Sequence, residues 1–251
     1  MMWAPLLIFL TFTTLLSGAI AALPPLNLEK DTKDHHGNPV GADEKSYSSN
    51  LELTDPTCMT SFTDDNLVWL VKKGYEDMLE KYPKDHPKED SLAGAPGAMV
   101  VFAPGGEKKI YLGSSVKGVL TCPEEYFVSK HIIDWFNKCG PHRTDGSCGE
   151  FNTLQGYFDG NPTPECRVPG DSRIVAWVNG RLAPPCSKDD YGKGCRDLLE
   201  HFALRAITSA TEGIKPTTGT EPAGTLKWVG KNEKNTNEWV TVVKGKGKRK
   251  C

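Results

Sequence analysis

Eight cysteines constrain the fold of this chain, because each must form a disulfide, bind a metal or remain a thiol. They stand at positions 58, 122, 139, 148, 166, 186, 195 and 251. In an oxidising compartment their even number favours four disulfide bridges. A zinc site that used three of them would leave five, hence two bridges and one odd thiol, for which the terminal Cys251 is the natural candidate. The cysteine count alone leaves both alternatives open.

The N-terminus predicts the compartment of the protein, and hence whether its cysteines meet oxidising conditions. Residues 6–16 form an uncharged apolar run, and Ala19-Ile20-Ala21 supplies the small residues that signal peptidase requires. We therefore expect residues 1–21 to be a cleaved secretory signal and the mature protein to be extracellular, with no membrane span after cleavage. The formal net charge of −2 implies no polyanionic partner by composition.

Composition divides the remainder into three parts. Residues 22–57 are polar and lack apolar periodicity, which predicts a disordered leader or pro-segment. Residues 58–243 carry the periodic segments and are long enough for one domain with a full core. Residues 244–251 form a basic tail, which is typical of solvated chain ends and could also contact phosphates.

Within the domain, hydrophobic periodicity predicts helices and strands in alternation. We expect helices over 64–82, 124–136, 148–158 and 195–207, a hairpin of strands over 98–103 and 109–114, and further strands over 173–179, 226–229 and 238–243. Cys122 and Cys139 flank the second helix and are the first candidates for a disulfide. Because strands and helices alternate, the pattern indicates a layered α/β domain.

Three cysteines in this pattern suit a metal site. Cys148 and Cys195 each fall at the start of a predicted helix, where the helix dipole and free N–H groups stabilise a thiolate. Cys186 follows the predicted strand 173–179, whose connection to the next helix would hold it nearby. A catalytic zinc needs three protein ligands and an open position. Glu150 lies two residues after Cys148 and could carry the protons of the reaction.

The same residues resemble a known family. Cys148-Gly149-Glu150 is similar to the His/Cys-x-Glu motif of the cytidine deaminase-like superfamily, and Pro185-Cys186 with Cys195 is similar to its Pro-Cys…Cys motif. The resemblance implies a three-layer fold with a mixed sheet flanked by helices, in which a β-hairpin precedes the Cys-x-Glu helix, a strand and the second cysteine helix. It also implies that Cys148, Cys186 and Cys195 bind zinc and that Glu150 shuttles the proton.

One feature departs from the family pattern. The usual motif is Pro-Cys-x-x-Cys, whereas eight residues, 187–194, separate Cys186 from Cys195 here. Gly192 and Gly194 would let this spacer loop out at little entropic cost. His142 could replace one cysteine as a ligand, but Pro141-His142-Arg143 reads as a loop, so the three cysteines are the preferred set.

Two functions follow as hypotheses. The first is a secreted zinc-dependent deaminase that acts on a nucleobase, nucleoside or nucleic acid and releases ammonia. The second is a non-catalytic secreted effector or interaction protein, stabilised by disulfides on the same scaffold. They differ in whether Cys148, Cys186 and Cys195 hold zinc or form disulfides.

Overall fold

The computed structural model describes residues 26, 28–31, 45–53, 62–88, 91–117, 129–144, 146–161, 168–189, 192–222 and 226–228. The strands are β1 (Glu29–Lys30), β2 (Tyr47–Leu53), β3 (Ala98–Ala103), β4 (Lys109–Ser114), β5 (Arg173–Val178), β6 (Arg181–Ala183), β7 (Arg205–Ile207) and β8 (Leu226–Trp228). The helices are α2 (Asp64–Asp85), the short 3-10 helix η1 (Leu92–Gly94), α4 (Lys130–Cys139), α5 (Gly149–Gly160) and α6 (Cys195–His201).

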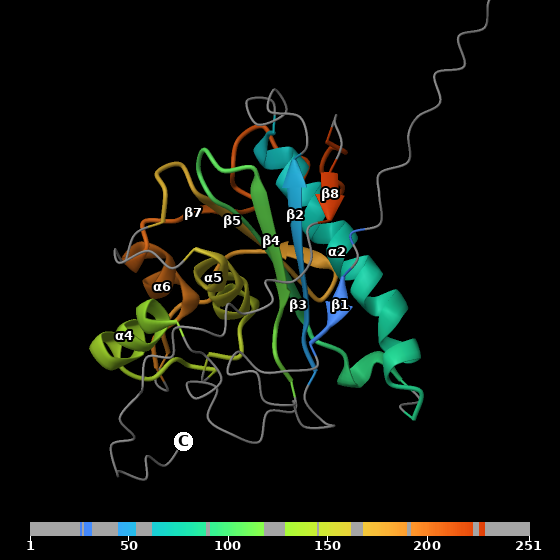
Figure 1. The fold of residues 1–251 in the computed structure, drawn as a ribbon, viewed down its shortest axis with the longest axis horizontal. Coiled ribbons are helices and arrows are strands. Elements are labelled where there is room, and N and C mark those ends of the chain that lie inside the picture. Colours follow the sequence, from blue (N-terminus) through green and yellow to red (C-terminus); the bar gives the residue numbers. More distant parts are fainter. Residues whose placement is uncertain are drawn as a thin grey trace, which may run out of the picture.

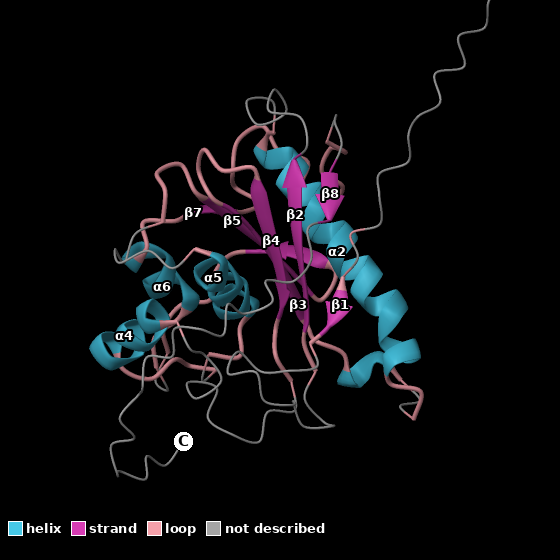
Figure 2. Cartoon of the chain, in the orientation of Figure 1, coloured by secondary structure: helices cyan, strands magenta, loops and turns pink. Residues whose placement is uncertain are grey.

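The strands form one largely antiparallel open sheet, on which the helices pack (Figures 1 and 2). Its order is β1–β2–β4–β3–β5–β6, with β8 paired to β2 and β7 paired to β5. Among the described strands, β5 and β7 are the pair that runs parallel. The expected mixed α/β class is therefore confirmed, and the deaminase-like assignment within that class remains a proposal.

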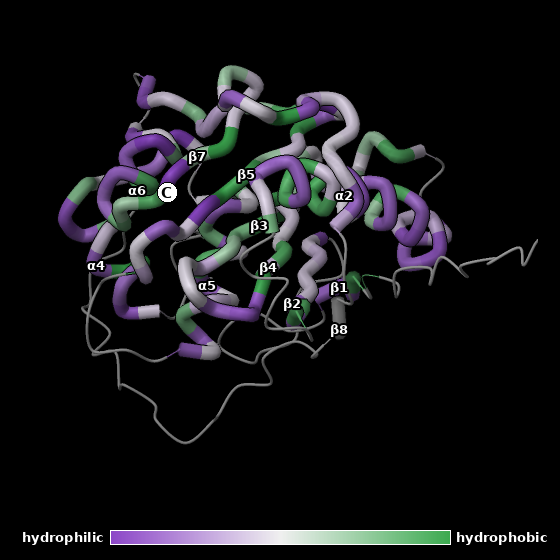
Figure 3. Tube along the Cα trace, turned by 90° about the horizontal axis from the view of Figure 1, so that it is seen from above, coloured by the Kyte–Doolittle hydropathy of each residue, from purple (hydrophilic) through white to green (hydrophobic). Residues whose placement is uncertain are grey.

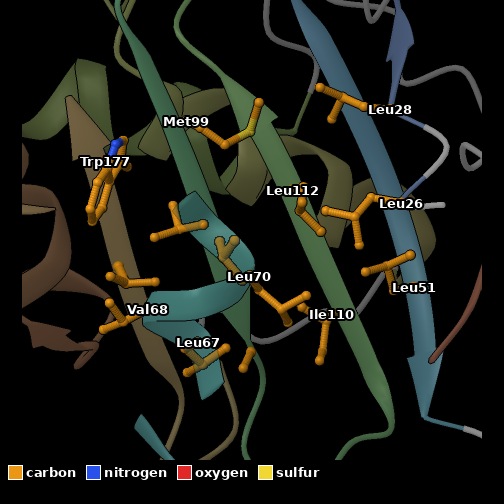
Figure 4. Packing of buried hydrophobic residues seen from close by; sticks show 14 of the residues in the cluster. Leu26, Leu28, Leu51, Leu67, Val68, Leu70, Met99, Ile110, Leu112 and Trp177 are labelled. Carbon is orange, nitrogen blue, oxygen red and sulfur yellow. The ribbon is translucent and has the colours of Figure 1, made fainter. Parts of the chain in front are cut away.

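The sheet separates two apolar layers (Figure 3). Alternate residues of a strand point to opposite faces, and β3 shows this directly. Met99 and Val101 pack with α2 on one face, whereas Val100 and Phe102 pack with α4, α5 and α6 on the other. Figure 4 shows side chains of α2 packed against the strands on the first face. The fold thus has three layers, and the candidate ligands Cys148, Cys186 and Cys195 belong to the second face.

The predicted hairpin has the expected bounds, and the predicted strand 173–179 is shorter by one residue. The hairpin strands 98–103 and 109–114 are β3 and β4, because their β-rich runs flank the turn Pro104-Gly105-Gly106-Glu107. The predicted strand 173–179 is β5, which ends at Val178. Asn179 and Gly180 then take φ values of 48° and 82°, which is the two-residue turn that joins β5 to β6.

Part of the segment expected to be a disordered leader, 22–57, lies in the sheet instead. Strand β2 pairs with β4 over Ser48–Glu52, and Tyr47, Leu51 and Leu53 are buried. The buried Ser49 interrupts the apolar series at positions 47, 49, 51 and 53 and hides the two-residue period of the strand, so composition alone misassigned it. The rest of the leader, the signal segment 1–21 and the tail 244–251 lie outside the described residues, apart from Leu26, 28–31 and 45–46.

Three helix boundaries also differ from the predictions. Helix α2 continues past Pro83 to Asp85, so Pro83 lies in its last turn instead of beyond its end. Helix α4 starts at Lys130 and runs to Cys139, whereas residues 118–128 lie outside the described part. Helix α6 ends at His201, and Ala203, with φ 53°, turns the chain into β7. The segment 195–207, which was predicted to be one helix, is therefore a helix followed by a strand.

Candidate metal centre

The three predicted cysteine ligands meet on the second face of the sheet. Cys148 is the N-cap of α5, and Cys195 is the first residue of α6. Cys186 lies in the loop that follows β6, so a short extra strand separates it from β5. Each is a free thiol in the structure. The three sulfur atoms and one histidine nitrogen all lie within 4.8 Å of one another.

That histidine is His142, which the sequence did not predict as an additional ligand. It is buried, with 1% of its surface exposed. Its Nε2 lies 3.5 Å from Sγ of Cys195 and 3.9 Å from Sγ of Cys186. Donor atoms that share one tetrahedral zinc lie about 3.5–4 Å apart, because Zn–S and Zn–N bonds measure about 2.3 and 2.0 Å. His142 thus stands at the distance of a fourth ligand.

A second set of contacts orients the donors. The backbone N–H of Thr144 donates to Nδ1 of His142 over 3.3 Å, and the Thr144 hydroxyl lies 3.0 Å from the same atom, so the opposite nitrogen, Nε2, faces the thiols. The same hydroxyl lies 3.1 Å from Sγ of Cys148. The backbone N–H of Cys195 donates to Sγ of Cys186 over 3.1 Å. Such outer contacts fix the orientation of ligands and are characteristic of metal sites.

The thiols also perturb one another. Hydrogen bonds from Cys148 and Cys195 hold the pKa of Cys186 far below its ordinary value. The bond to Cys186 raises the pKa of Cys148, and the bonds to Cys148 and Cys186 raise the pKa of Cys195. Three thiols at such close range compete for protons, whereas a divalent cation would let all of them be thiolates.

The donor set fits zinc. Three sulfurs and one imidazole nitrogen are the Cys₃His combination that four-coordinate zinc sites use, and soft thiolates select against magnesium and calcium. The four residues are buried or half-buried, as a structural centre requires. The expectation of a metal site at Cys148, Cys186 and Cys195 is therefore supported by geometry, and His142 extends the set to four.

Glu150 lies beside the cluster. The residue is buried at 7% exposure in the first turn of α5. Burial raises the pKa of its carboxyl group, and hydrogen bonds from its own backbone N–H and from Cys195 oppose that shift. It also lines a small cavity of about 10 Å³ that is otherwise apolar, with walls that include Ile174, Pro185 and Leu199. That is about the space of one water molecule, whereas typical small-molecule pockets measure about 300–1,000 Å³, so the cavity is too small for a substrate in the present conformation.

Two glycines bring α5 against the sheet. A Cβ on Gly113 of β4 would lie 2.6 Å from Oγ1 of Thr153 and 3.0 Å from its backbone nitrogen. A Cβ on Gly149 would lie 2.7 Å from a methyl group of Val100. The middle residue of Cys148-Gly149-Glu150 is therefore glycine for a packing reason. This close approach fixes how far Cys148 and Glu150, at the start of α5, lie from the sheet.

The remaining predicted site residues lie elsewhere. Cys122 is outside the described residues, so the predicted Cys122–Cys139 disulfide stays a prediction, and Cys139 has no disulfide partner among the described residues. His131 packs against Phe158, and Trp177 is buried in the apolar layer beneath α2.

Comparison with known proteins adds no relative: no family model, curated protein or solved structure matches the chain. Within the described part of the chain, no helix has the length and apolar character needed to cross a membrane. Arguments about function therefore rest on the site itself.

Proposed function

We propose that this protein is a zinc-dependent hydrolytic deaminase. Its reaction would consume water, replace the exocyclic amino group of a cyclic amidine with oxygen, and release ammonia. The observation that carries the proposal is the convergence of Cys148, Cys186 and Cys195 on one point with the buried Glu150 beside them. A carboxyl group that contacts a candidate metal ligand, Cys195, and lines a cavity is placed to move protons.

The order of elements supports this assignment. A hairpin, β3–β4, leads to helix α5 with the Cys-x-Glu residues at its start, and strand β5 then leads towards helix α6. This is the order that the resemblance to the cytidine deaminase-like superfamily implies. The two cysteine-bearing helices lie on the same face of the sheet, so their N-terminal residues can share one ion.

Each residue has a distinct role under this proposal. Cys148, Cys186 and Cys195 would hold zinc, which supplies Lewis acidity and lowers the pKa of a water molecule. Glu150 would accept a proton from water and deliver it to the departing nitrogen. The apolar walls of its pocket, including Ile174 and Leu199, exclude bulk water from that transfer.

Nucleobases, nucleosides and nucleic acids are the substrate classes that the resemblance implies. Secretion, predicted from residues 1–21, would direct such an activity to substrates outside the producing cell. The choice among these classes depends on the loops around the pocket.

A second function is favoured by His142. Four protein donors complete a tetrahedron, and Cys₃His sites of this kind stabilise folds without catalysis. Under this alternative the protein is a non-catalytic secreted interaction protein on the same scaffold, with zinc in place of some of the expected disulfides.

Ammonia release distinguishes the two functions. Zinc-loaded protein would be assayed with cytosine, cytidine, adenosine, and single-stranded DNA and RNA, beside the variants Glu150→Gln and Glu200→Gln. Glu200 is an exposed acid on α6 and serves as the matched control. We expect release by the wild type and by Glu200→Gln, and a loss of about 10²–10⁴-fold in Glu150→Gln with zinc retained. Zinc-loaded wild type that releases no ammonia, or release that Glu150→Gln leaves unchanged, would contradict the deaminase proposal.

A further inference from the structure

The loop that carries His142 is bound to the spacer between Cys186 and Cys195, residues 187–194. The backbone N–H of Arg143 donates to the carbonyl of Lys193 over 2.9 Å, and the N–H of Lys193 donates to the carbonyl of Pro141 over 3.0 Å. These two bonds flank His142, which pairs with Lys193 as a parallel β-bridge. The spacer thus fixes the backbone on both sides of the histidine.

Side chains reinforce the same contact. Nε of Arg143 lies 3.2 Å from a carboxylate oxygen of Asp189, and its guanidinium also donates to the carbonyl of Ser187 over 3.2 Å. The spacer itself is folded back by two backbone bonds between Asp189 and Gly192. Its described residues, 187–189 and 192–194, therefore pack against the His142 loop.

Gly192 allows this close approach. A Cβ at this position would lie 2.4 Å from the carbonyl oxygen of Pro141 and 3.0 Å from the backbone nitrogen of Arg143. Both neighbours are backbone atoms that cannot turn aside, so any side chain at 192 would push the His142 loop away. The requirement for glycine is specific to the contact between the spacer and this loop.

The spacer is also where the chain departs from the Pro-Cys-x-x-Cys pattern. A two-residue spacer could not form the bridge to Pro141, His142 and Arg143, because Asp189, Gly192 and Lys193 would be missing. The extra residues of the spacer therefore serve to position the extra donor, His142.

We propose that His142 is a fourth, loop-borne ligand that closes the metal centre, and that the spacer 187–194 holds it in place. With His142 bound, the tetrahedron has no position for water, so the observed conformation is a closed state. The proposed deaminase activity, on which this last step rests, requires the His142 loop to withdraw. The narrow pocket beside Glu150 agrees with a closed state.

Cobalt substitution tests the coordination without relying on activity. The full-length mature protein would be loaded with Co²⁺, and its visible and near-ultraviolet absorption followed during titration with azide. We compare the wild type with His142→Ala, Gly192→Ala and Gly170→Ala. Gly170 is the matched control, because a Cβ there would meet nothing within 4 Å.

We expect wild type and Gly170→Ala to show a spectrum that azide leaves unchanged. His142→Ala and Gly192→Ala should show a shifted spectrum and saturable azide binding, because each opens one coordination position. A wild-type centre that already binds azide, or a His142→Ala spectrum identical to the wild type, would overturn the proposal. Gly192→Ala keeps all four donors, so it also tests the role of the spacer.

Ammonia release from the same samples separates this inference from the proposed function. If only a fraction f of the wild-type protein is open, turnover is proportional to f. A variant that is fully open should therefore turn over 1/f times faster than the wild type. If His142→Ala and Gly192→Ala bind azide but no sample releases ammonia, the fourth ligand is supported and the deaminase proposal is rejected. Ammonia release with an azide-accessible wild-type centre would retain the deaminase and reject the fourth ligand.

Discussion

Thr144 contacts two of the four donor residues. Its hydroxyl contacts both Nδ1 of His142 and Sγ of Cys148, although the side chain itself is exposed. We predict that Thr144→Ala weakens zinc binding by about 10–100-fold, the usual cost of removing an outer-shell partner. Competition with a chromophoric chelator would measure this affinity.

The matched variant is Thr144→Ser, which keeps the hydroxyl and loses only a methyl group. It should bind zinc within a few-fold of the wild type. Equal affinities in the alanine and serine variants would show that the hydroxyl does not orient the ligands, and the account of Thr144 would then be wrong.

At the same scale, the sequence pointed to the three clustered cysteines but offered His142 only as a possible replacement for one of them. Cys148, Cys186 and Glu150 were predictable because a helix start and a strand end place them locally. His142 was not, because its position depends on a bridge to Lys193, far along the chain. A general signal was available: structural zinc sites use four ligands, and the motif supplied only three.

At the scale of elements, the packing of α5 on the sheet decides where the centre stands. Gly113→Ala would drive a methyl group into the backbone of Thr153. We predict that it lowers the free energy of unfolding by about 1–3 kcal/mol, as overpacking does in well-packed interiors. Urea unfolding of the zinc-loaded protein would measure the change.

Gly156→Ala is the control for this substitution. Gly156 lies in α5 itself, and a Cβ there would come no closer than 4.0 Å to Tyr111. Because alanine favours helix more than glycine does, we expect no loss of stability. If both variants lose the same stability, the close approach of α5 to Gly113 is not what holds the helix.

The elements themselves were predictable to different degrees. The β3–β4 hairpin follows from short-range turn chemistry, and β5 from a continuous apolar run. Strands β2 and β7 were missed, because each is defined by the neighbour it pairs with: β2 by β4, and the three-residue β7 by β5. A short or polar strand carries little signal of its own.

At the scale of the whole molecule, the centre ties one layer of the fold together. Its donors come from the start of α5, the start of α6, the loop after α4 and the loop after β6, all on the second face. Helix α2 packs on the opposite face and supplies none of them. Metal binding should therefore stabilise the two layers unequally.

Chelation tests this asymmetry. We predict that removing the metal raises amide hydrogen exchange in residues 130–160 and 186–201 far more than in α2, because these segments lose their shared anchor. It should also lower the free energy of unfolding by about 3 kcal/mol or more where zinc exceeds its dissociation constant 100-fold. An equal rise in amide hydrogen exchange in α2 and in α5 after chelation would contradict a centre confined to one layer.

The central claim is that Cys148, Cys186 and Cys195 hold a metal together with His142. Native mass spectrometry of the purified mature protein tests it most directly, because a bound zinc adds mass whereas each disulfide removes two hydrogens. The account predicts one zinc per chain, lost on denaturation in acid, with these three cysteines then alkylated as free thiols. A chain without metal, in which any of the three is joined in a disulfide, would contradict it.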